Sequence, residues 1–386
     1  MLILLKRCEV ISSGNKGVND ILIGSGKILA IAKEISIDKR LEVDEVDCLG
    51  LKALPGLIDA HVHIAGAGGE GGPASRTPEL RLSSMIEAGV TTVVGSLGTD
   101  GITRSVESVL MKVKSLRQQG VSAWMFTGSY QIPPPTILGS VAKDIALIDE
   151  VIGVGEIAIA DHRSSFPTTE ELVKLALQAR VGGMLGGKSG IVNIHMGDAM
   201  NPFRQLYEAV NISELKLSQF WPTHCNRNHY IFQDAKEYGK KSHLDLTTSS
   251  YPYFPDDEIK TSKAIAELLK AGVSVENITV TSDACGSLPG FDENGNLVRL
   301  EMGLSKSVFT EIVDCVLEEK IPIENAIKVA TENVARILKL ANKGRIEVGK
   351  DADLILLNQD FQIVHYLANG IFMKKNFQVL KVGNYE

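Results

Sequence analysis

The stretch GLIDAHVHI, residues 56–64, opens the long middle part of the chain and decides the prediction of its fold. Its apolar run is typical of a buried strand, and the run ends in two histidines separated by one valine. In a doubly wound open sheet, we would expect the first strand to be followed by a glycine fingerprint that binds phosphate. The His-Val-His ending therefore favours the alternative α/β architecture, a (β/α)8 or TIM barrel.

Seven further strand-like runs follow the first one, and amphipathic stretches separate them. TPELRLSSMIEAG (77–89) and SKAIAELLKAG (262–272) are two such stretches, and their final glycines are typical of helix C-caps. Eight strand-and-helix units in series predict a closed parallel barrel. The seven runs are VTTVVGSLG (90–98), VSAWMFTGS (121–129), VIGVGEIAIAD (151–161), GIVNIHMGD (190–198), FWPTHCNRN (220–228), SHLDLTTSS (242–250) and NITVTSDACG (277–286).

The two ends of the chain have a different pattern from its middle. Residues 1–54 and 345–386 consist of short strand-like segments punctuated by Gly, Asn and Asp. We therefore expect a small β-sandwich domain formed from both termini, beside a barrel domain of residues 55–344. A glycine-rich run at 182–190, GGMLGGKSG, partly matches a phosphate-binding loop but precedes a strand, so we expect a tight turn there.

The composition sets limits on partners and location. The 386 residues carry a formal net charge of −7, which argues against nucleic acid and against an anionic membrane surface as partners. Five scattered cysteines form no CxxC pair, as expected for a reducing compartment. The N-terminus lacks the features of a signal peptide, and no apolar run approaches the roughly 20 residues of a membrane span. These features predict a cytoplasmic protein.

Polar side chains gather at the predicted strand ends. Because the carboxyl ends of barrel strands converge on one face, we expect these side chains to lie together. Four histidines and two carboxylates suit one or two divalent ions such as Zn²⁺. The residues are His61, His63, Glu156, His195, His224 and Asp283.

The chain resembles the β-aspartyl (isoaspartyl) dipeptidases of the amidohydrolase superfamily. The resemblance covers nearly the full chain. Its motifs are HVHIAGAGGEGGPASRTPE (61–79), GSLGTDGITRS (95–105), TGSYQIP (127–133), ADHRSSFP (160–167), RVGGMLGGKSG (180–190), HMGD (195–198), PTHCNRN (222–228), SDACGSLP (282–289) and GRIEVGKDADLILL (344–357). It implies a metallo-dipeptidase with this same fold, assembled as a homo-oligomer, commonly an octamer.

The resemblance also implies how the metals are held. His61, His63 and Asp283 would bind one ion and His195 and His224 a second, with a hydroxide bridging the two. Family members bridge the metals with a carbamylated lysine, but no lysine occurs between Lys143 and Lys174, and Glu156 stands at that place. We expect Glu156 to bridge the ions and Gly155 to permit the close approach that its shorter side chain needs. The competing outcome is one tightly held ion and one weak or absent ion.

Two residues are expected to take part in the chemistry that the resemblance implies. The hydroxide would attack the side-chain amide of a β-aspartyl dipeptide. Asp283 would carry a proton to the leaving amine, and Tyr130 would donate to the oxyanion.

The dipeptide is a zwitterion, and the chain offers a matching set of charges. Arg163 and Arg227 would bind its carboxylates, since arginine holds a carboxylate through two parallel hydrogen bonds. Glu70 would pair with its ammonium group. The family pattern adds Ser287 and the backbone at Thr99 as further contacts.

Two other functions stay open at this point. One is a related amidohydrolase that acts on cyclic amides or N-acyl amino acids. A neutral cyclic substrate would need no charge set such as Glu70, Arg163 and Arg227. The other is a barrel scaffold without catalysis, which should have lost several of the metal-binding positions that this chain retains.

Overall fold

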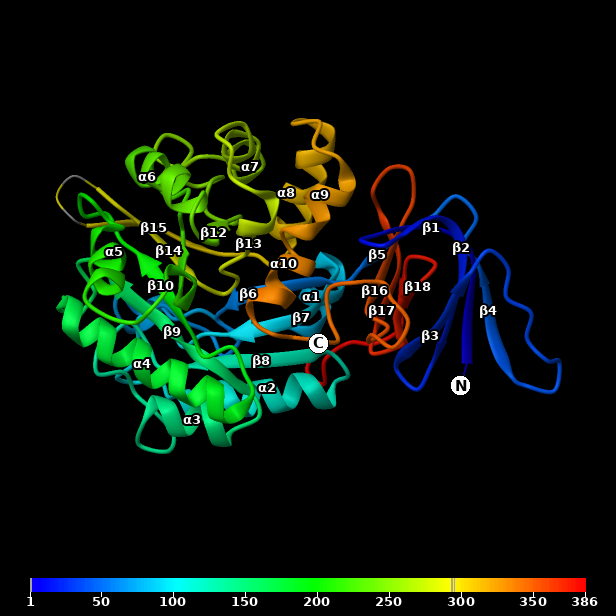
Figure 1. The fold of residues 1–386 in the computed structure, drawn as a ribbon, viewed down its shortest axis with the longest axis horizontal. Helices are drawn as coiled ribbons and strands as arrows, with labels where there is room; N and C mark the ends of the chain where they lie inside the picture. Colours follow the sequence, from blue (N-terminus) through cyan, green and yellow to red (C-terminus); the bar gives the residue numbers. More distant parts are fainter. Residues whose placement is uncertain (1, 293, 295) are drawn as a thin grey trace.

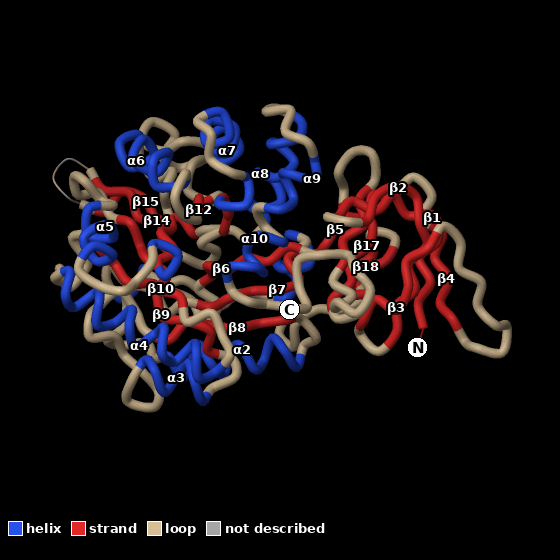
Figure 2. The backbone as a smooth tube through the Cα atoms, in the orientation of Figure 1, coloured by secondary structure: helices blue, strands red, loops and turns tan. Residues whose placement is uncertain are grey.

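The computed structural model describes residues 2–292, 294 and 296–386. Parallel strands lie inside a layer of helices, and a mostly antiparallel sheet stands to one side of them (Figure 1). No helix of the described part is long and apolar enough to cross a membrane. Figure 2, coloured by secondary structure, separates the two regions clearly, because helices surround the parallel strands but not the mostly antiparallel sheet.

Each of the eight predicted runs contains a strand of the inner layer. Six of the strands form one parallel sheet in sequence order, and the last two form a parallel pair. The strands are β6 (Leu57–Val62), β7 (Val90–Gly95), β8 (Ser122–Thr127), β9 (Val151–Ile159), β10 (Ile191–Met196), β11 (Phe220–Thr223), β12 (Leu244–Thr247) and β13 (Ile278–Thr281).

Backbone hydrogen bonds join the edges of the sheet and the pair. The amide of Cys225, after β11, donates to the carbonyl of Asp245 in β12 at 3.1 Å. The amide of Asp283, after β13, donates to the carbonyl of His61 in β6 at 3.0 Å. The last strand thus lies beside the first, and the parallel sheet curls in the manner of a TIM barrel. The curled parallel sheet confirms the prediction of a TIM-barrel type of fold.

Helices cover the outside of the curled sheet. Nearly every residue of the parallel strands is buried, as expected for strands covered on both faces. The helices are α1 (Leu82–Ala88), α2 (Val106–Gln118), α3 (Val141–Leu147), α4 (Thr169–Gly186), α5 (Arg204–Asn211), α6 (His229–Gly239), α7 (Thr261–Lys270), α8 (Lys306–Leu317), α9 (Ile323–Lys328) and α10 (Glu332–Ile337), with 3-10 turns η1 (Pro73–Ser75), η2 (Leu217–Gln219) and η3 (Val275–Asn277).

Local signals set several helix ends. A capping box of Thr168 and Glu171 starts α4, and Gly89 ends α1 in the left-handed conformation at φ 70°. The run at 182–190 is helical as far as Gly186, so the prediction of a tight turn there was wrong for its first half. A Cβ on Gly183 would lie 2.7 Å from the Cα of Gly190, so the glycines let two backbone segments pack closely.

Both ends of the chain contribute to one nine-stranded sheet. Its buried side chains form a hydrophobic cluster of their own, drawn from residues 3–53 and 346–367. The strands are β1 (Leu2–Ser12), β2 (Asn15–Gly24), β3 (Lys27–Ala32), β4 (Val43–Asp47), β5 (Lys52–Pro55), β16 (Leu354–Leu357), β17 (Ile363–Ala368), β18 (Ile371–Lys375) and β19 (Gln378–Val379). A separate antiparallel hairpin, β14 (Ser287–Phe291) and β15 (Leu297–Met302), rises from the end of the inner sheet.

Candidate metal centre and substrate cavity

Six side chains lie together at the carboxyl ends of the inner strands, and we call this group the floor. They are the six residues that the sequence singled out as metal ligands. His61 lies in β6 and His63 directly follows it, whereas His224 and Asp283 follow β11 and β13. The complete floor is His61, His63, Glu156, His195, His224 and Asp283.

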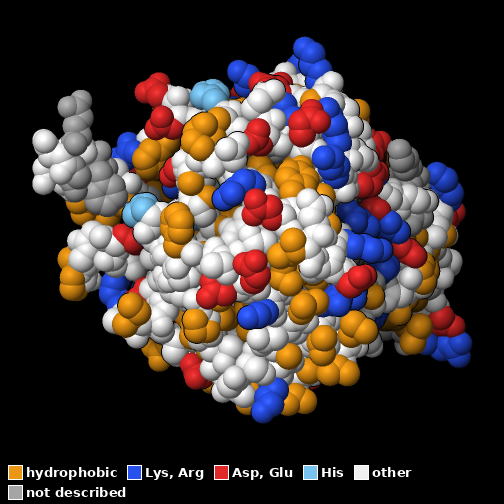
Figure 3. Space-filling view, turned by 60° about the vertical axis from the view of Figure 1, so that its left-hand side comes forward, with side chains coloured by type: hydrophobic (Ala, Val, Ile, Leu, Met, Phe, Trp, Pro, Cys, Tyr) orange, Lys and Arg blue, Asp and Glu red, His pale blue; other side chains and the backbone are white. Residues whose placement is uncertain are grey.

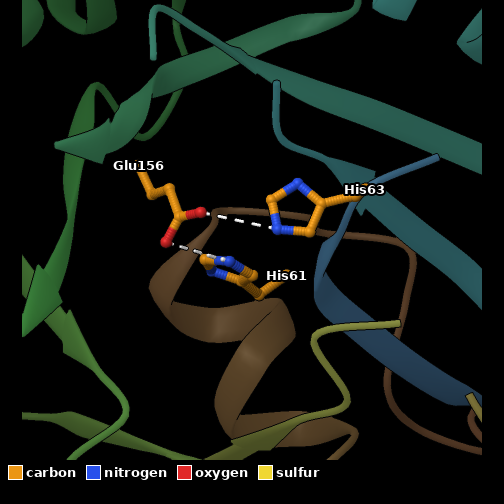
Figure 4. Close-up of side chains that lie close together, drawn as sticks. All are labelled: His61, His63 and Glu156. Carbon is orange, nitrogen blue, oxygen red and sulfur yellow. Dashed lines mark ion pairs between the residues drawn. The ribbon is translucent and has the colours of Figure 1, made fainter. Parts of the chain in front are cut away.

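Glu156, in β9, stands at the centre of the floor. Its Oε1 lies 3.5 Å from His63 Nε2, and its Oε2 lies 3.3 Å from His61 Nε2. Figure 4 shows this carboxylate directed between the two rings. The same Oε2 lies 3.0 Å from His195 Nδ1 and 3.5 Å from His224 Nε2. One carboxylate therefore faces all four histidines.

The spacing of the donor atoms fits divalent cations. Four ligands at about 2.0–2.1 Å around a tetrahedral ion stand roughly 3.3 Å apart. The distances within the floor run from 2.9 Å, between His63 Nε2 and Asp283 Oδ1, to 3.7 Å, between His61 Nε2 and Asp283 Oδ1. Glu156 belongs to two groups whose donor atoms lie within 4.8 Å of one another, one with His61 and His63 and one with His195 and His224.

Three of the histidines have their second ring nitrogen held by a fixed partner. His63 Nδ1 lies 3.3 Å from the carbonyl oxygen of Ser96, and His224 Nδ1 lies 2.6 Å from Thr247 Oγ1. His195 Nε2 lies 3.0 Å from Asp161 Oδ2. Such contacts orient a ring and direct its other nitrogen toward a metal.

His61 differs from the other three. It is buried, and neither of its ring nitrogens has a hydrogen-bond partner among the described residues. Burial opposes its protonation, but the carboxylates of Glu156 and Asp283 outweigh burial and raise the pKa of His61 to about 9. The negative potential that would protonate this ring is equally suited to hold a cation in its place. The pKa of His224 is lowered to about 4, first by burial, so its ring is neutral at pH 7, as a ligand must be.

Strand β9 lies so close to β10 that only glycine fits at position 155, directly before Glu156. A Cβ on Gly155 would lie 2.7 Å from the Cβ of Asn193 in β10. Any larger residue at 155 would push the strands apart. The glycine thus lets β9 and β10 pack closely beside Glu156, whereas the approach of Glu156 to the ions stays a prediction.

The floor lies at the bottom of a cavity of about 520 Å³, within the roughly 300–1,000 Å³ typical of small-molecule sites. The predicted substrate-binding residues all line it, and these are Glu70, Thr99, Tyr130, Arg163, Arg227 and Ser287.

Glu70, Thr99, Tyr130 and Arg163 form one side of the cavity. Thr99 Oγ1 donates to Glu70 Oε1 at 3.1 Å, and Arg163 Nη1 lies 3.6 Å from the same oxygen. The other oxygen of Glu70 is buried without a hydrogen-bond partner among the described residues. The Tyr130 hydroxyl lies 2.9 Å from His195 Nδ1, and burial raises its pKa well above the usual value. It is therefore a protonated donor at neutral pH.

Four groups that orient the floor or the arginines were not predicted from the sequence. Asp161 holds His195 and makes two hydrogen bonds to the Arg163 side chain, at 3.0 and 2.9 Å. Thr247 and the Ser96 carbonyl hold the other two rings, and Asp198 accepts from Arg227 Nε at 2.8 Å. Asp161 and Thr247 end or follow inner strands, as the predicted ligands do. Ser96 and Asp198 follow β7 and β10 in the same way, so position alone could have pointed to all four.

Comparisons with known proteins show which family the chain belongs to. The amidohydrolase family matches residues 191–383. A crystal structure of a β-aspartyl dipeptidase from the thermophilic, keratin-degrading Fervidobacterium islandicum AW-1, in complex with a β-Asp-Leu dipeptide, is 43% identical with a TM-score of 0.94. The match covers 100% of this chain and 99% of that one. A second structure of a β-aspartyl dipeptidase from the same organism is 40% identical with a TM-score of 0.91, and both chains are covered in full.

More distant proteins are similar in structure or in sequence. A dihydropyrimidinase structure from Brevibacillus agri is 15% identical with a TM-score of 0.69, covering 99% of this chain and 97% of that one. An allantoinase from Enterococcus faecalis is 22% identical, and the match covers 92% of this chain and 86% of its own length.

Proposed function

The chain belongs to the amidohydrolase family, and from this premise we propose that it is a metal-dependent dipeptidase that hydrolyses β-aspartyl dipeptides. The observation that carries the proposal is one cavity that combines a floor of metal-binding side chains with Glu70, Arg163 and Arg227. A zwitterionic dipeptide needs both an anion and cations for its charged ends, whereas a neutral cyclic amide needs neither. The charge set thus favours the dipeptidase over a hydrolase of cyclic amides.

Two divalent cations, proposed to be Zn²⁺, fit the floor. His61, His63 and Asp283 would hold one ion, His195 and His224 the other, and Glu156 would bridge them. Cations held there would lower the pKa of water from about 15.7 toward 7 and polarise the scissile carbonyl. The two groups of donor atoms that share Glu156, one with His61 and His63 and one with His195 and His224, support this assignment.

Asp283 and Tyr130 are proposed to act on the reacting atoms. The Asp283 side chain is 14% exposed, against 1% for Glu156, so it is the carboxylate of the floor that can exchange a proton with the cavity. It would take the proton of the attacking water and deliver it to the leaving amine. The Tyr130 hydroxyl would donate to the oxygen of the scissile amide as negative charge develops there.

The charged residues around the floor are proposed to orient the substrate. The unpartnered oxygen of Glu70 would accept from the α-ammonium group, and Arg163 and Arg227 would bind the two carboxylates. Thr99 fixes Glu70 through its hydrogen bond, and Ser287 begins the hairpin strand β14, which also lines the cavity. Holding the dipeptide at both ends would place its β-amide over the floor.

We further propose a division into a barrel domain of residues 55–344 and a β-sandwich of residues 1–54 and 345–386. The separate hydrophobic cluster of the terminal sheet supports it.

A cytoplasmic location agrees with five buried, free cysteines. A homo-oligomer is supported by the exposed apolar side chains of Leu147, Met184 and Leu185 on the adjoining helices α3 and α4. The face drawn in Figure 3 intermixes acidic and basic side chains, which offers no support for a nucleic-acid partner.

A direct assay tests the proposed reaction. Purified protein loaded with Zn²⁺ is incubated with β-Asp-Leu and, separately, with α-Asp-Leu, and free leucine is measured. We expect release of leucine from β-Asp-Leu alone. Cleavage of neither dipeptide by protein that holds two equivalents of metal would contradict the proposal.

A further inference from the structure

The loop between β12 and α7 forms a wall of the cavity that the roles assigned above leave unexplained. Ser250, Phe254, Asp257 and Glu258 line the cavity from this loop, and we call them the β12 wall. Its two charged groups are both carboxylates. From their placement we infer that the β12 wall binds the side chain of the residue released from the dipeptide and selects a cationic side chain. This inference rests on the proposed dipeptidase function.

The β12 wall is held in place before any substrate binds. Ser250 Oγ donates to Glu258 Oε2 at 2.6 Å, and the amide of Glu258 donates to the carbonyl of Phe254 at 3.0 Å. From the hairpin, Arg299 donates to the carbonyl of Tyr253 at 2.8 Å and lies over the Phe254 ring, 4.8 Å from its centroid. The Glu258 carboxylate is therefore fixed in direction, which lowers the entropic cost of binding a ligand there.

Buried Asn226 anchors the base of the same loop. Its side-chain amide donates to the carbonyls of Thr247 and Ile259, each at 2.9 Å, and its oxygen accepts from the amide of Thr247 at 2.8 Å. These bonds tie the start and the end of the loop to the segment that carries His224. The β12 wall thus keeps its distance from the floor.

The order of the strands places the β12 wall away from the groups assigned to the aspartyl half. In strand order β12 is four strands from β8, whose following loop carries Tyr130. Around the closed sheet, Thr99 and Arg163 follow β7 and β9, which are three strands from β12, and Glu70 follows β6, which is two strands away. If the aspartyl half occupies that side and its amide lies over the floor, the released residue extends toward the β12 wall.

The chemistry of this end of the cavity favours a long side chain with a cationic tip. Phe254, Leu288 and Pro289 offer apolar surface to an aliphatic stem. Arg227, whose charge acts on Glu258, also lines this end of the cavity, and its role in this proposal is to bind the α-carboxylate of the released residue. The tip of the side chain then meets Asp257 and Glu258, which attract lysine or arginine and repel aspartate or glutamate.

A substrate panel tests the inference. Values of kcat/KM are measured for β-Asp-Lys, β-Asp-Leu and β-Asp-Glu with the metal-loaded wild-type protein and with D257N/E258Q. In the wild type we expect lysine to exceed glutamate by at least about tenfold. In the double variant the ratio of lysine to leucine should fall by about tenfold. D256N is the matched control, since exposed Asp256 carries the same charge in the same loop outside the cavity lining, and its ratio should stay as in the wild type.

The ratio of kcat/KM values distinguishes a loss of selectivity from general damage to the protein, because a misfolded site would lower the rates for all three dipeptides together. Cleavage of all three dipeptides without preference for lysine over glutamate would overturn the inference and leave the dipeptidase function standing. An unchanged ratio in D257N/E258Q would overturn it as well. Cleavage of none of them would overturn both.

Discussion

The floor and the β12 wall lie in one cavity but are built in opposite ways. The floor consists of side chains on or directly after strands, and its central donors face one another with His61 left unpartnered. The β12 wall consists of loop residues, and one of its two carboxylates, that of Glu258, already accepts a hydrogen bond from Ser250. The difference indicates a division of labour. The donor atoms of the floor need a cation between them. The β12 wall is already held by hydrogen bonds within the protein and needs only a substrate side chain to bind.

Loss of the proton carrier should have the largest effect. In D283N the side chain keeps its size but cannot take up a proton, so kcat/KM for β-Asp-Leu should fall by about 10²–10⁴. Steady-state kinetics measure the loss, and metal analysis of the same sample shows whether one ion has gone with it. Activity within twofold of the wild type would exclude Asp283 from the chemistry.

Removal of the Tyr130 hydroxyl should come next. Y130F keeps the ring but removes the donor proposed for the oxyanion, and kcat should fall by about 10²–10³. KM should change little, because the substrate is held mainly through its charged ends. A rise in KM with kcat preserved would instead assign Tyr130 to ground-state binding.

Asp161 holds a floor histidine without belonging to the floor, so its replacement should have a smaller effect than replacement of a floor residue. D161N weakens the contact that orients His195, and metal affinity should fall by about 10–100-fold. Competition with a chelator measures it. D198N is the control, because Asp198 holds Arg227 and makes no contact with a floor histidine, and its metal affinity should match the wild type. Equal losses in both variants would show that Asp161 has no special role.

The smallest effect is expected at the β12 wall, as a dependence on pH. Burial raises the pKa of Glu258 to about 7, against the opposing effects of its bond from Ser250 and of nearby Arg227. Asp257 and Asp283 also raise it. Glu258 is therefore neutral below that pKa and anionic above it, while a lysine side chain stays charged up to about pH 10.

The preference for β-Asp-Lys over β-Asp-Leu should accordingly rise about two- to fivefold between about pH 6 and pH 8. The ratio of kcat/KM values measures it, because pH effects on the floor act on both substrates and cancel. E258Q should make the ratio independent of pH. A ratio that still rises in that variant would place the titrating group elsewhere.

The floor and the β12 wall also differ in how well they could be predicted from the sequence. Strand periodicity places a residue at a strand end, and strand ends meet, so five of the floor residues could be predicted from their positions, whereas Glu156 lies inside β9 and its bridging place came from the resemblance. The resemblance supplied Glu70, Arg163 and Arg227. Glu258 was not predicted, because a loop's path depends on tertiary contacts such as those of Asn226 and Arg299, which leave no periodic signal. The helical start of the run at 182–190 was missed for a similar reason, since packing against Gly190 decides it.

We propose that Glu156 bridges two cations at the place where the family resemblance implies a modified lysine. Metal content after dialysis tests it most directly, in the wild type and in E156Q. We expect two equivalents of Zn²⁺ in the wild type and one or fewer in E156Q. Two equivalents in both proteins, or none in the wild type, would contradict it.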